Sequence, residues 1–283
     1  MTSCFFITDL HGIKERYEKL FLKILSEKPD LIFFGGDLFP NTFSSEWKDK
    51  DFLNDFLIIE LQKIKNRLGK EYPKIFIILG NDDARSEEED MIKYDKQEIW
   101  KYLHNKKIIF NEYSIFGYSY IPPTPFMLKD WEKYDVSRFV DPGCVSPEEG
   151  SRTIEVSNYE KKYSTIKDDL SELFQNDDLS KTIILFHSPP YKTKLDRADL
   201  DGKMIDFVPF DVHVGSIAIQ RFIENRSPYL TLHGHIHEST RLTGSYLDTI
   251  NETIMLNAAH DGTELSLIKF QLEDLSTIER VIL

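Results

Sequence analysis

The sequence has few cysteines and no long apolar run, and both absences restrict the kind of protein it encodes. Cys4 and Cys144 are the two cysteines among 283 residues, so neither a disulfide framework nor a Cys-x-x-Cys pair is available. No stretch approaches the roughly 18 consecutive apolar residues of a membrane-spanning helix, and the first residues lack a basic signal-like segment. We therefore expect a cytoplasmic protein without a membrane segment.

Positive charge is also scarce. Lys and Arg number 35 against 48 Asp and Glu, which gives a net charge of −13. Because binding to a nucleic-acid polymer depends on Lys and Arg that neutralise many phosphates, long nucleic acid is not an expected partner. A small phosphorylated substrate remains compatible with this charge if bound cations meet its phosphate.

Apolar strands that alternate with amphipathic helices indicate an α/β fold. Strands are predicted at 3–8, 30–34 and 74–79, with helices at 13–26 and 51–69 between them. This order predicts parallel strands joined by crossover helices. Further strands are predicted at 107–110, 113–118, 182–186, 229–232, 254–256, 265–268 and 278–282, and further helices at 161–175 and 214–226.

The length suits one large α/β domain, and we expect residues 1–283 to form a single domain. Five prolines between 122 and 147 exclude a long helix, so about 119–160 is predicted to be an irregular insertion or cap. Its basic residues Lys129, Arg138 and Arg152 are expected to be solvated, with contact to a substrate phosphate as the alternative. The charged segment 85–98 is interpreted as a solvated face.

Polar residues of ligand type follow five of the predicted strands. Because ligands of open α/β sheets bind beyond the carboxyl ends of the strands, these side chains are expected to converge. They are Asp9, His11, Asp37, Asn81, His187, His235 and His237.

This set of side chains predicts two metal ions. Asp, Asn and His donors without a thiolate suit divalent Mn, Fe or Zn. Seven donors exceed what one tetrahedral site uses, and they suit two cations roughly 3.5–4 Å apart that share a carboxylate, an arrangement used for phosphoester cleavage.

The five strand ends, taken in order, resemble the calcineurin-like metallophosphoesterase superfamily. They read Asp-x-His, Gly-Gly-Asp, Gly-Asn-x-Asp, His-x-Pro-Pro and Gly-His-x-His between residues 9 and 237. The segments 122–126 and 233–239 are similar to a prokaryotic branch of it. The resemblance implies a four-layer α/β/β/α sandwich of two mixed β-sheets flanked by helices.

The resemblance also implies roles for the seven residues. Asp9, His11, Asp37 and His237 would hold the first metal ion, and Asp37, Asn81, His187 and His235 the second, with Asp37 as the bridge. The expected nucleophile is a hydroxide between the two ions, whose charge lowers the pKa of bound water.

One position departs from the family pattern. Asp82 stands where Gly-Asn-His-Asp/Glu usually has a histidine that assists the leaving group or binds phosphate. A carboxylate beside two cations stays ionised, so it is a poor general acid and repels a dianion more than a monoanion. We therefore predict a preference for phosphodiesters, or for esters with good leaving groups, over ordinary monoesters, and so most simply a phosphodiesterase. Asp83 is expected to orient a ligand histidine by a hydrogen bond.

Two alternatives remain open from the sequence. One is a phosphomonoesterase or nucleotidase, and the other is a non-catalytic, metal-bound interaction module of the same fold. Neither the oligomeric state nor the substrate can be predicted. Of the remaining histidines, His233 is expected to be structural, and His104 and His213 are expected to be surface or capping residues.

Overall fold

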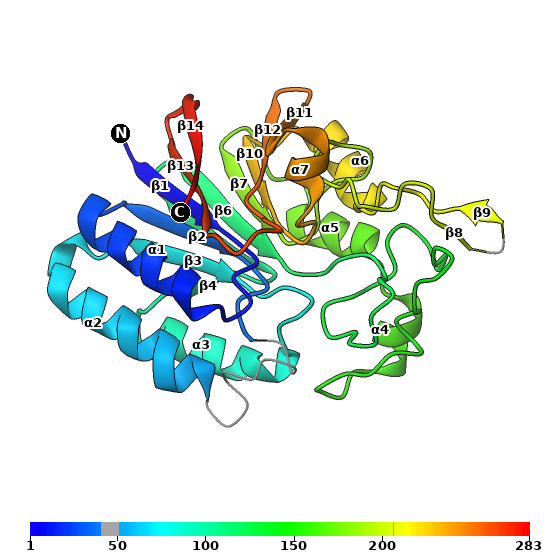
Figure 1. Cartoon of the computed structure of the whole chain (residues 1–283), viewed down its shortest axis with the longest axis horizontal. Coiled ribbons are helices and arrows are strands. Elements are labelled where there is room, and N and C mark those ends of the chain that lie inside the picture. Colours follow the sequence, from blue (N-terminus) through cyan, green and yellow to red (C-terminus); the bar gives the residue numbers. More distant parts are fainter. Residues whose placement is uncertain (41–50, 206) are drawn as a thin grey trace.

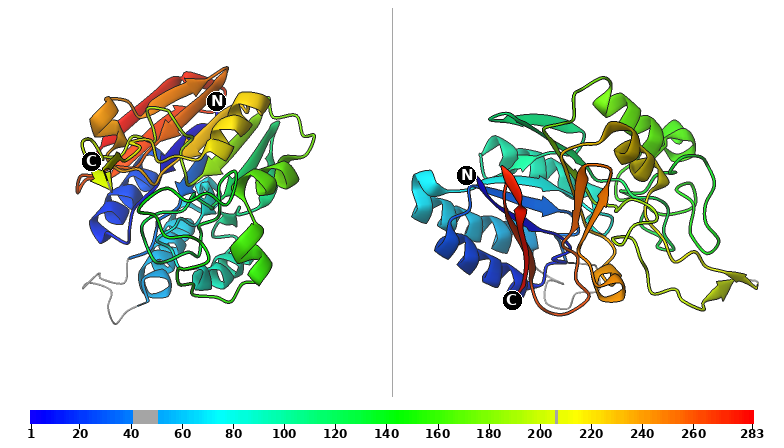
Figure 2. Two further views of the ribbon diagram at one scale, coloured as in Figure 1. Left: turned by 90° about the vertical axis from the view of Figure 1, so that its right-hand side faces the viewer. Right: turned by 90° about the horizontal axis from the view of Figure 1, so that it is seen from above.

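Two mixed β-sheets form the centre of the protein in the computed structural model, which describes residues 1–40, 51–205 and 207–283. Their strand orders are β14-β13-β1-β2-β3-β4 in the first sheet and β11-β12-β10-β7-β6-β5 in the second. Helices α1, α2 and α3 lie outside the first sheet, and α5 and α6 lie outside the second (Figure 1, Figure 2). The predicted four-layer sandwich is confirmed.

The first sheet contains β1 (Ser3–Ile7), β2 (Leu31–Gly35), β3 (Lys74–Ile78), β4 (Lys101–Tyr102), β13 (Ser266–Gln271) and β14 (Asp274–Ile282). The second contains β5 (Lys106–Phe110), β6 (Tyr113–Tyr118), β7 (Thr182–Phe186), β10 (Leu230–His233), β11 (Leu247–Ile250) and β12 (Thr253–Asn257). The α-helices are α1 (Lys14–Glu27), α2 (Ile58–Leu68), α3 (Glu88–Lys96), α4 (Asn158–Tyr163), α5 (Ile166–Phe174), α6 (Ile217–Arg226) and α7 (Ser239–Thr243).

Alternation along the central strands creates two apolar cores. In β1, Cys4 and Phe6 join a core between the two sheets, whereas Phe5 and Ile7 join a core that includes α1 and α2. Because neighbouring side chains of a strand point to opposite faces, a strand that is apolar at every position is covered on both faces. The parallel pairing of β1, β2 and β3 was predicted correctly.

Some elements differ from the sequence prediction. The helix predicted at 161–175 is divided into α4 and α5, because Thr165 is extended and its side chain accepts the Asp168 N–H as an N-cap. The helix predicted at 51–69 begins with a π-helical turn, η1 (Leu53–Leu57). The loop predicted before 211 contains a hairpin of β8 (Met204–Ile205) and β9 (Val208–Pro209).

The irregular segment 119–160 is anchored by buried and half-buried polar groups rather than by regular structure. The carboxylate of Asp130 accepts the main-chain N–H of Arg85, and that of Asp135 accepts the main-chain N–H of Ile217 at the start of α6. Lys129 is buried, and its Nζ lies 2.5 Å from Glu132 Oε2, so the expectation that Lys129 is solvated is wrong. Burial of this amine is tolerated because a carboxylate partner is buried with it.

The charged segment 85–98 contains the short 3-10 helix η3 (Arg85–Glu87) and α3. Its apolar residues Met91 and Tyr94 face the core, and its acidic run is more exposed. Among the described residues, no helix has both the length and the apolar composition needed to cross a bilayer.

Candidate metal centre

The seven predicted ligand residues come together at one end of the two sheets. Each follows the carboxyl end of a strand: β1, β2 and β3 in the first sheet, and β7 and β10 in the second. The two sheets meet where His187 Nε2 lies 3.2 Å from Asp37 Oδ2. Side chains separated by up to 228 positions therefore occupy one site.

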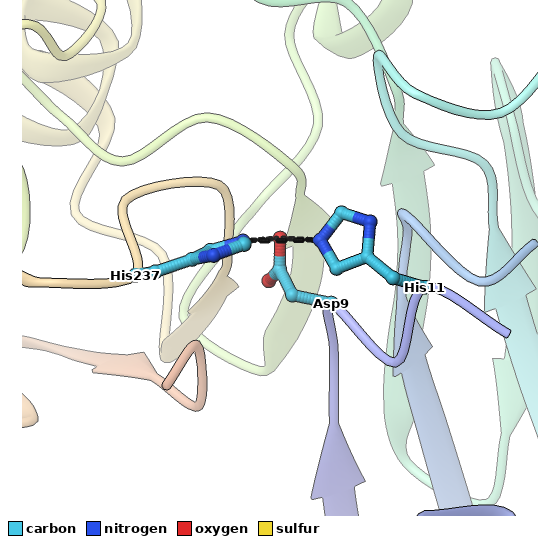
Figure 3. Close-up of side chains that lie close together, drawn as sticks. All are labelled: Asp9, His11 and His237. Carbon is cyan, nitrogen blue, oxygen red and sulfur yellow. Dashed lines mark hydrogen bonds and ion pairs between the residues drawn. The ribbon is translucent and has the colours of Figure 1, made fainter. Parts of the chain in front are cut away.

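A first cluster contains Asp9, His11 and His237. His237 Nε2 lies 3.1 Å from Asp9 Oδ1 and 3.1 Å from His11 Nε2. Figure 3 shows the two imidazoles directed toward each other beside the Asp9 carboxylate. One candidate ligand atom from each residue lies within 4.8 Å of the others. Three convergent N and O donors of this kind can hold a divalent cation.

A second cluster contains Asp37, His187 and His235, again with donor atoms within 4.8 Å of one another. His187 Nδ1 lies 2.8 Å from the Gly35 carbonyl oxygen, so this nitrogen carries the proton and donates it. Nε2 is then the nitrogen that faces the cluster, 3.1 Å from Asn81 Oδ1, and it can offer a lone pair to a cation once it has lost its proton. Such a main-chain acceptor fixes the tautomer that a metal-binding histidine needs.

A third group links these two clusters. Donor atoms of His11, Asp37 and Asp82 also lie within 4.8 Å of one another, with His11 Nδ1 3.6 Å from Asp82 Oδ2. His11 thus belongs to the first and third groups, and Asp37 to the second and third. The two clusters are therefore adjacent parts of one site.

The main chain at this site is strained. Asp9, His11, Asp37 and His235 have φ values of 55°, 48°, 50° and 69°, which L-residues seldom adopt. Each such conformation costs about 1–3 kcal/mol and persists only where surrounding contacts hold it. Four strained residues among seven candidate ligands indicate a site built for function rather than for stability.

Close approach of the loops requires glycine at two points. A Cβ at Gly80 would collide with Asp37 Oδ1 and would lie 2.7 Å from His187 Cε1. A Cβ at Gly234 would collide with Thr8 Oγ1 and would lie 2.5 Å from Asp9 Oδ2. The glycines of the Gly-Asn and Gly-His motifs therefore let the strand ends meet.

The electrostatics favour anionic carboxylates at both clusters. Burial alone would raise the pKa of Asp9, but hydrogen bonding and charge from His237 lower it below the ordinary value. Burial likewise opposes ionisation of Asp37, and His187 lowers its pKa. In return, Asp37 overcomes the effect of burial and raises the pKa of His187 to about 10. Burial, then the His187 charge, lowers the pKa of His235 to about 3. The pKa is raised for His187 and His237 alike, so a cation that binds here would compete with their protons.

Asp82 and Asp83 have different surroundings. The Asp82 side chain is 38% exposed, and burial and the charge of Asp37 raise its pKa. Asp83 is fully buried and accepts the main-chain N–H groups of Leu38, Phe39 and Gly80 at 2.8–2.9 Å. Its hydrogen bonds therefore join the loops that carry Asp37 and Asn81, and the expectation that it bonds a ligand histidine is not met.

Thr8 and Arg16 support Asp9 but were not singled out from the sequence. The Thr8 hydroxyl donates to Asp9 Oδ2 at 2.7 Å, and Arg16 Nη1 donates to the Asp9 carbonyl oxygen at 2.7 Å. His235 N also donates to the Asp9 carboxylate, at 3.1 Å. Proximity to Asp9 in the sequence was the one available signal for Thr8.

Of the histidines outside the clusters, His233 is buried and both its ring nitrogens have partners. Nδ1 lies 2.9 Å from the Ser188 carbonyl oxygen, and Nε2 lies 2.8 Å from Thr231 Oγ1. His104 is also buried, with its ring centroid 4.8 Å from that of Trp131, so the expected surface position of His104 is wrong. His213 is partly exposed, and its Nδ1 lies 2.8 Å from Asp196 Oδ1.

Known proteins share this fold and part of the sequence. The "Uncharacterized protein MJ1162" of Methanocaldococcus jannaschii is 37% identical over 81 residues, which are 28% of this chain. The match spans 31% of that relative's length. TT1561 of Thermus thermophilus has a TM-score of 0.54 at 15% identity, covering 99% of this chain and 98% of its own. A dimetal phosphatase from Danio rerio has a TM-score of 0.51 at 10% identity, with 95% and 91% covered. At these identities the two solved structures establish the fold alone.

The sequence family follows from a longer match. The model of the calcineurin-like phosphoesterase family matches residues 3–239, a span that includes all seven candidate ligands. The chain therefore belongs to the calcineurin-like phosphoesterases, a family of metal-dependent hydrolases.

Proposed function

We propose that the protein is a dinuclear metal-dependent phosphodiesterase that acts on a small substrate. The observation that carries this proposal is the pair of adjacent clusters, Asp9/His11/His237 and Asp37/His187/His235, linked through His11 and Asp37. Enzymes that hold two neighbouring cations commonly use them to cleave phosphoesters.

The donor set fits two divalent cations. Asp9, His11, Asp37 and His237 would hold the first, and Asp37, Asn81, His187 and His235 the second, with Asp37 shared. The buried carboxylates have lowered pKa values and supply negative charge, and no thiolate is among the donors. Nitrogen and oxygen donors of this kind suit Mn, Fe or Zn.

When bound, the cations would supply positive charge for the phosphoryl group and would lower the pKa of a water molecule. The chain's own residues keep the site in place. Gly35 fixes the tautomer of His187, and Thr8 and His235 N hold the Asp9 carboxylate. Asp83 ties the Asp37 and Asn81 loops together, so the donors need little rearrangement on binding.

Asp82 favours a diester over a monoester. Its half-exposed carboxylate lies at the rim of the site, where it repels phosphate oxygens. Two unit charges roughly 4 Å apart interact by about 1 kcal/mol in water and about 4 kcal/mol at a protein surface. A dianionic monoester therefore loses more binding energy here than a monoanionic diester does.

We also propose one domain over residues 1–283, with the 119–160 cap contributing to substrate specificity.

Hydrolysis of bis-p-nitrophenyl phosphate and p-nitrophenyl phosphate tests the proposal. With Mn, Fe, Co, Ni or Zn added, the wild type is expected to cleave the diester faster. Asp37→Ala and His235→Ala should each lower diester turnover by at least about 100-fold, because loss of a supporting group alone costs about 10–100-fold. Asp199→Asn is the matched control, since Asp199 is exposed and contacts no candidate ligand.

Each alternative predicts a different result. A phosphomonoesterase or nucleotidase would cleave the monoester far faster than the diester, and Asp82 would then have another role. A wild type that binds two cations but cleaves neither ester would be an interaction module. Thermal unfolding of each variant shows whether lost activity reflects lost structure.

A further inference from the structure

We propose that Asp82 positions His11 for cation binding by accepting the proton of its Nδ1. The effect is to direct the lone pair of His11 Nε2 into the Asp9/His11/His237 cluster. Asp82 would then have a second role, besides the proposed repulsion of dianionic substrates. This inference rests on the proposed function, because it assumes that the cluster holds a cation.

The two nitrogens of His11 face different groups. Nε2 lies 3.1 Å from His237 Nε2 and 4.0 Å from Asp9 Oδ1, both of which belong to the first cluster. Nδ1 lies on the other side of the ring, 3.6 Å from Asp82 Oδ2. The imidazole therefore stands between the first cluster and the Asp82 carboxylate.

A neutral imidazole carries one N–H and one lone pair. If Nε2 provides the lone pair for a cation, the proton must be on Nδ1, where it needs an acceptor. In His187 the acceptor for the Nδ1 proton is the Gly35 carbonyl oxygen, 2.8 Å from Nδ1. For His11 the acceptor that faces Nδ1 is the Asp82 carboxylate, and a separation of 3.6 Å needs only a small shift to become a hydrogen bond.

The other contacts of Asp82 leave one oxygen for this role. Its Oδ1 accepts the Asn81 side-chain amide at 3.0 Å, and its main-chain N–H donates to Asp37 Oδ1 at 2.8 Å. Oδ2 is the oxygen that faces His11. Asp82 is thus held by Asn81 and by Asp37 of the second cluster while it contacts a residue of the first. A carboxylate that accepts from a metal-binding histidine raises the basicity of that histidine.

Zinc binding to the metal-free full-length protein tests the inference. Isothermal titration of the wild type should resolve two binding events. In Asp82→Ala, one affinity should fall by about 10–100-fold, as when other partners of ligand histidines are removed. The second affinity should fall less than the first, through loss of the Asp82 contact to the Asn81 side-chain amide. Asp82→Asn keeps an oxygen acceptor and should recover part of the loss. Asp199→Asn also removes one carboxylate charge, at an exposed residue paired with Arg241, and should bind as the wild type does.

The imidazole N–H signals of the zinc-saturated protein provide an independent readout. His11 Nδ1–H should give a downfield, slowly exchanging proton resonance that is absent in His11→Gln. Asp82→Asn should move it upfield, and Asp82→Ala should let it exchange with solvent.

Three outcomes would overturn the inference: unchanged affinities in Asp82→Ala, a stoichiometry of one zinc at saturation in that variant, which would make Asp82 a ligand, or a His11 proton on Nε2. The result is separate from the proposed function. Two bound zinc ions with the expected His11 signal, but no ester hydrolysis, would refute only the phosphodiesterase.

Discussion

The buried carboxylate of Asp9 is oriented by hydrogen bonds from its neighbours. Its Oδ2 accepts the Thr8 hydroxyl at 2.7 Å, so Oδ1 is left facing His237 at 3.1 Å. A buried carboxylate oxygen that loses its donor retains the full cost of desolvation, about 1–3 kcal/mol. Thr8 therefore supports the first cluster, although it would not itself touch a cation.

Replacement of Thr8 by Val tests this single hydrogen bond. Valine keeps the shape of threonine but has no hydroxyl, so Asp9 Oδ2 loses a donor. We expect cation affinity of one site to fall by about tenfold or more, as for other supporting contacts of ligands. Thr8→Ser retains the hydroxyl and should bind like the wild type in calorimetric titration. Equal affinities for Thr8→Val and the wild type would refute this role.

Asp83 offers a second prediction at the scale of one residue. Asparagine in its place would turn a side-chain N–H toward a main-chain N–H, at Gly80 or at Leu38 and Phe39. A buried donor without an acceptor costs about 1–3 kcal/mol. Asp83→Asn should lower the free energy of unfolding by that amount in urea titrations, and Asp199→Asn should not. An Asp83→Asn protein as stable as the wild type would contradict this account.

At the scale of elements, the 119–160 segment packs beside β6 through a buried histidine, whose ring also stacks on Tyr118 of β6. His104 precedes β5, and its ring lies 4.8 Å from the Trp131 ring and 5.2 Å from the Tyr120 ring, between centroids. Nδ1 accepts the Ser119 N–H at 3.1 Å. Burial, followed by the charges of Arg85, Lys133 and Lys106, lowers the pKa of His104 well below 6.5. The ring is therefore neutral in the folded protein.

The contribution of His104 to stability should depend on pH. Its stabilisation is fully present above the unfolded pKa of about 6.5 and is lost as pH falls, because the unfolded chain then binds a proton that the folded chain does not. The difference in free energy of unfolding between wild type and His104→Gln should shrink by about 1.4 kcal/mol from pH 7.5 to 5.5. Urea titrations at both pH values, with chelator present, measure it. A constant difference would show that the folded protein also binds the proton.

For the whole molecule, the candidate metal centre joins the two sheets. Asp9, Asp37 and Asn81 follow strands of the first sheet, whereas His187, His235 and His237 follow strands of the second. A cation held by both groups binds the folded chain and not the unfolded one. It therefore stabilises the association of the two sheets.

Metal removal should lower the melting temperature. At a free cation concentration about 100 times Kd, each site adds about 2.7 kcal/mol, which corresponds to several degrees in a chain of this size. Calorimetry in Mn and in EDTA measures the difference, and it should be smaller in Asp37→Ala. Identical melting temperatures in Mn and in EDTA would show that no cation binds across the sheets.

The sequence alone indicated the family, through five motifs in order, and the seven residues that converge; the layer order followed from that resemblance. It could do so because each ligand-type residue directly follows an apolar strand, and this pattern is local. Only the tertiary structure decided which atoms face one another: Asp82 toward His11 Nδ1, Asp83 toward the main chain of two loops, and His104 into the core. It also decided that β13 pairs with β1, which begins 263 residues earlier. Such contacts join segments that are distant in the chain, so their hydrogen bonds and burial leave no signal in the periodicity of either segment.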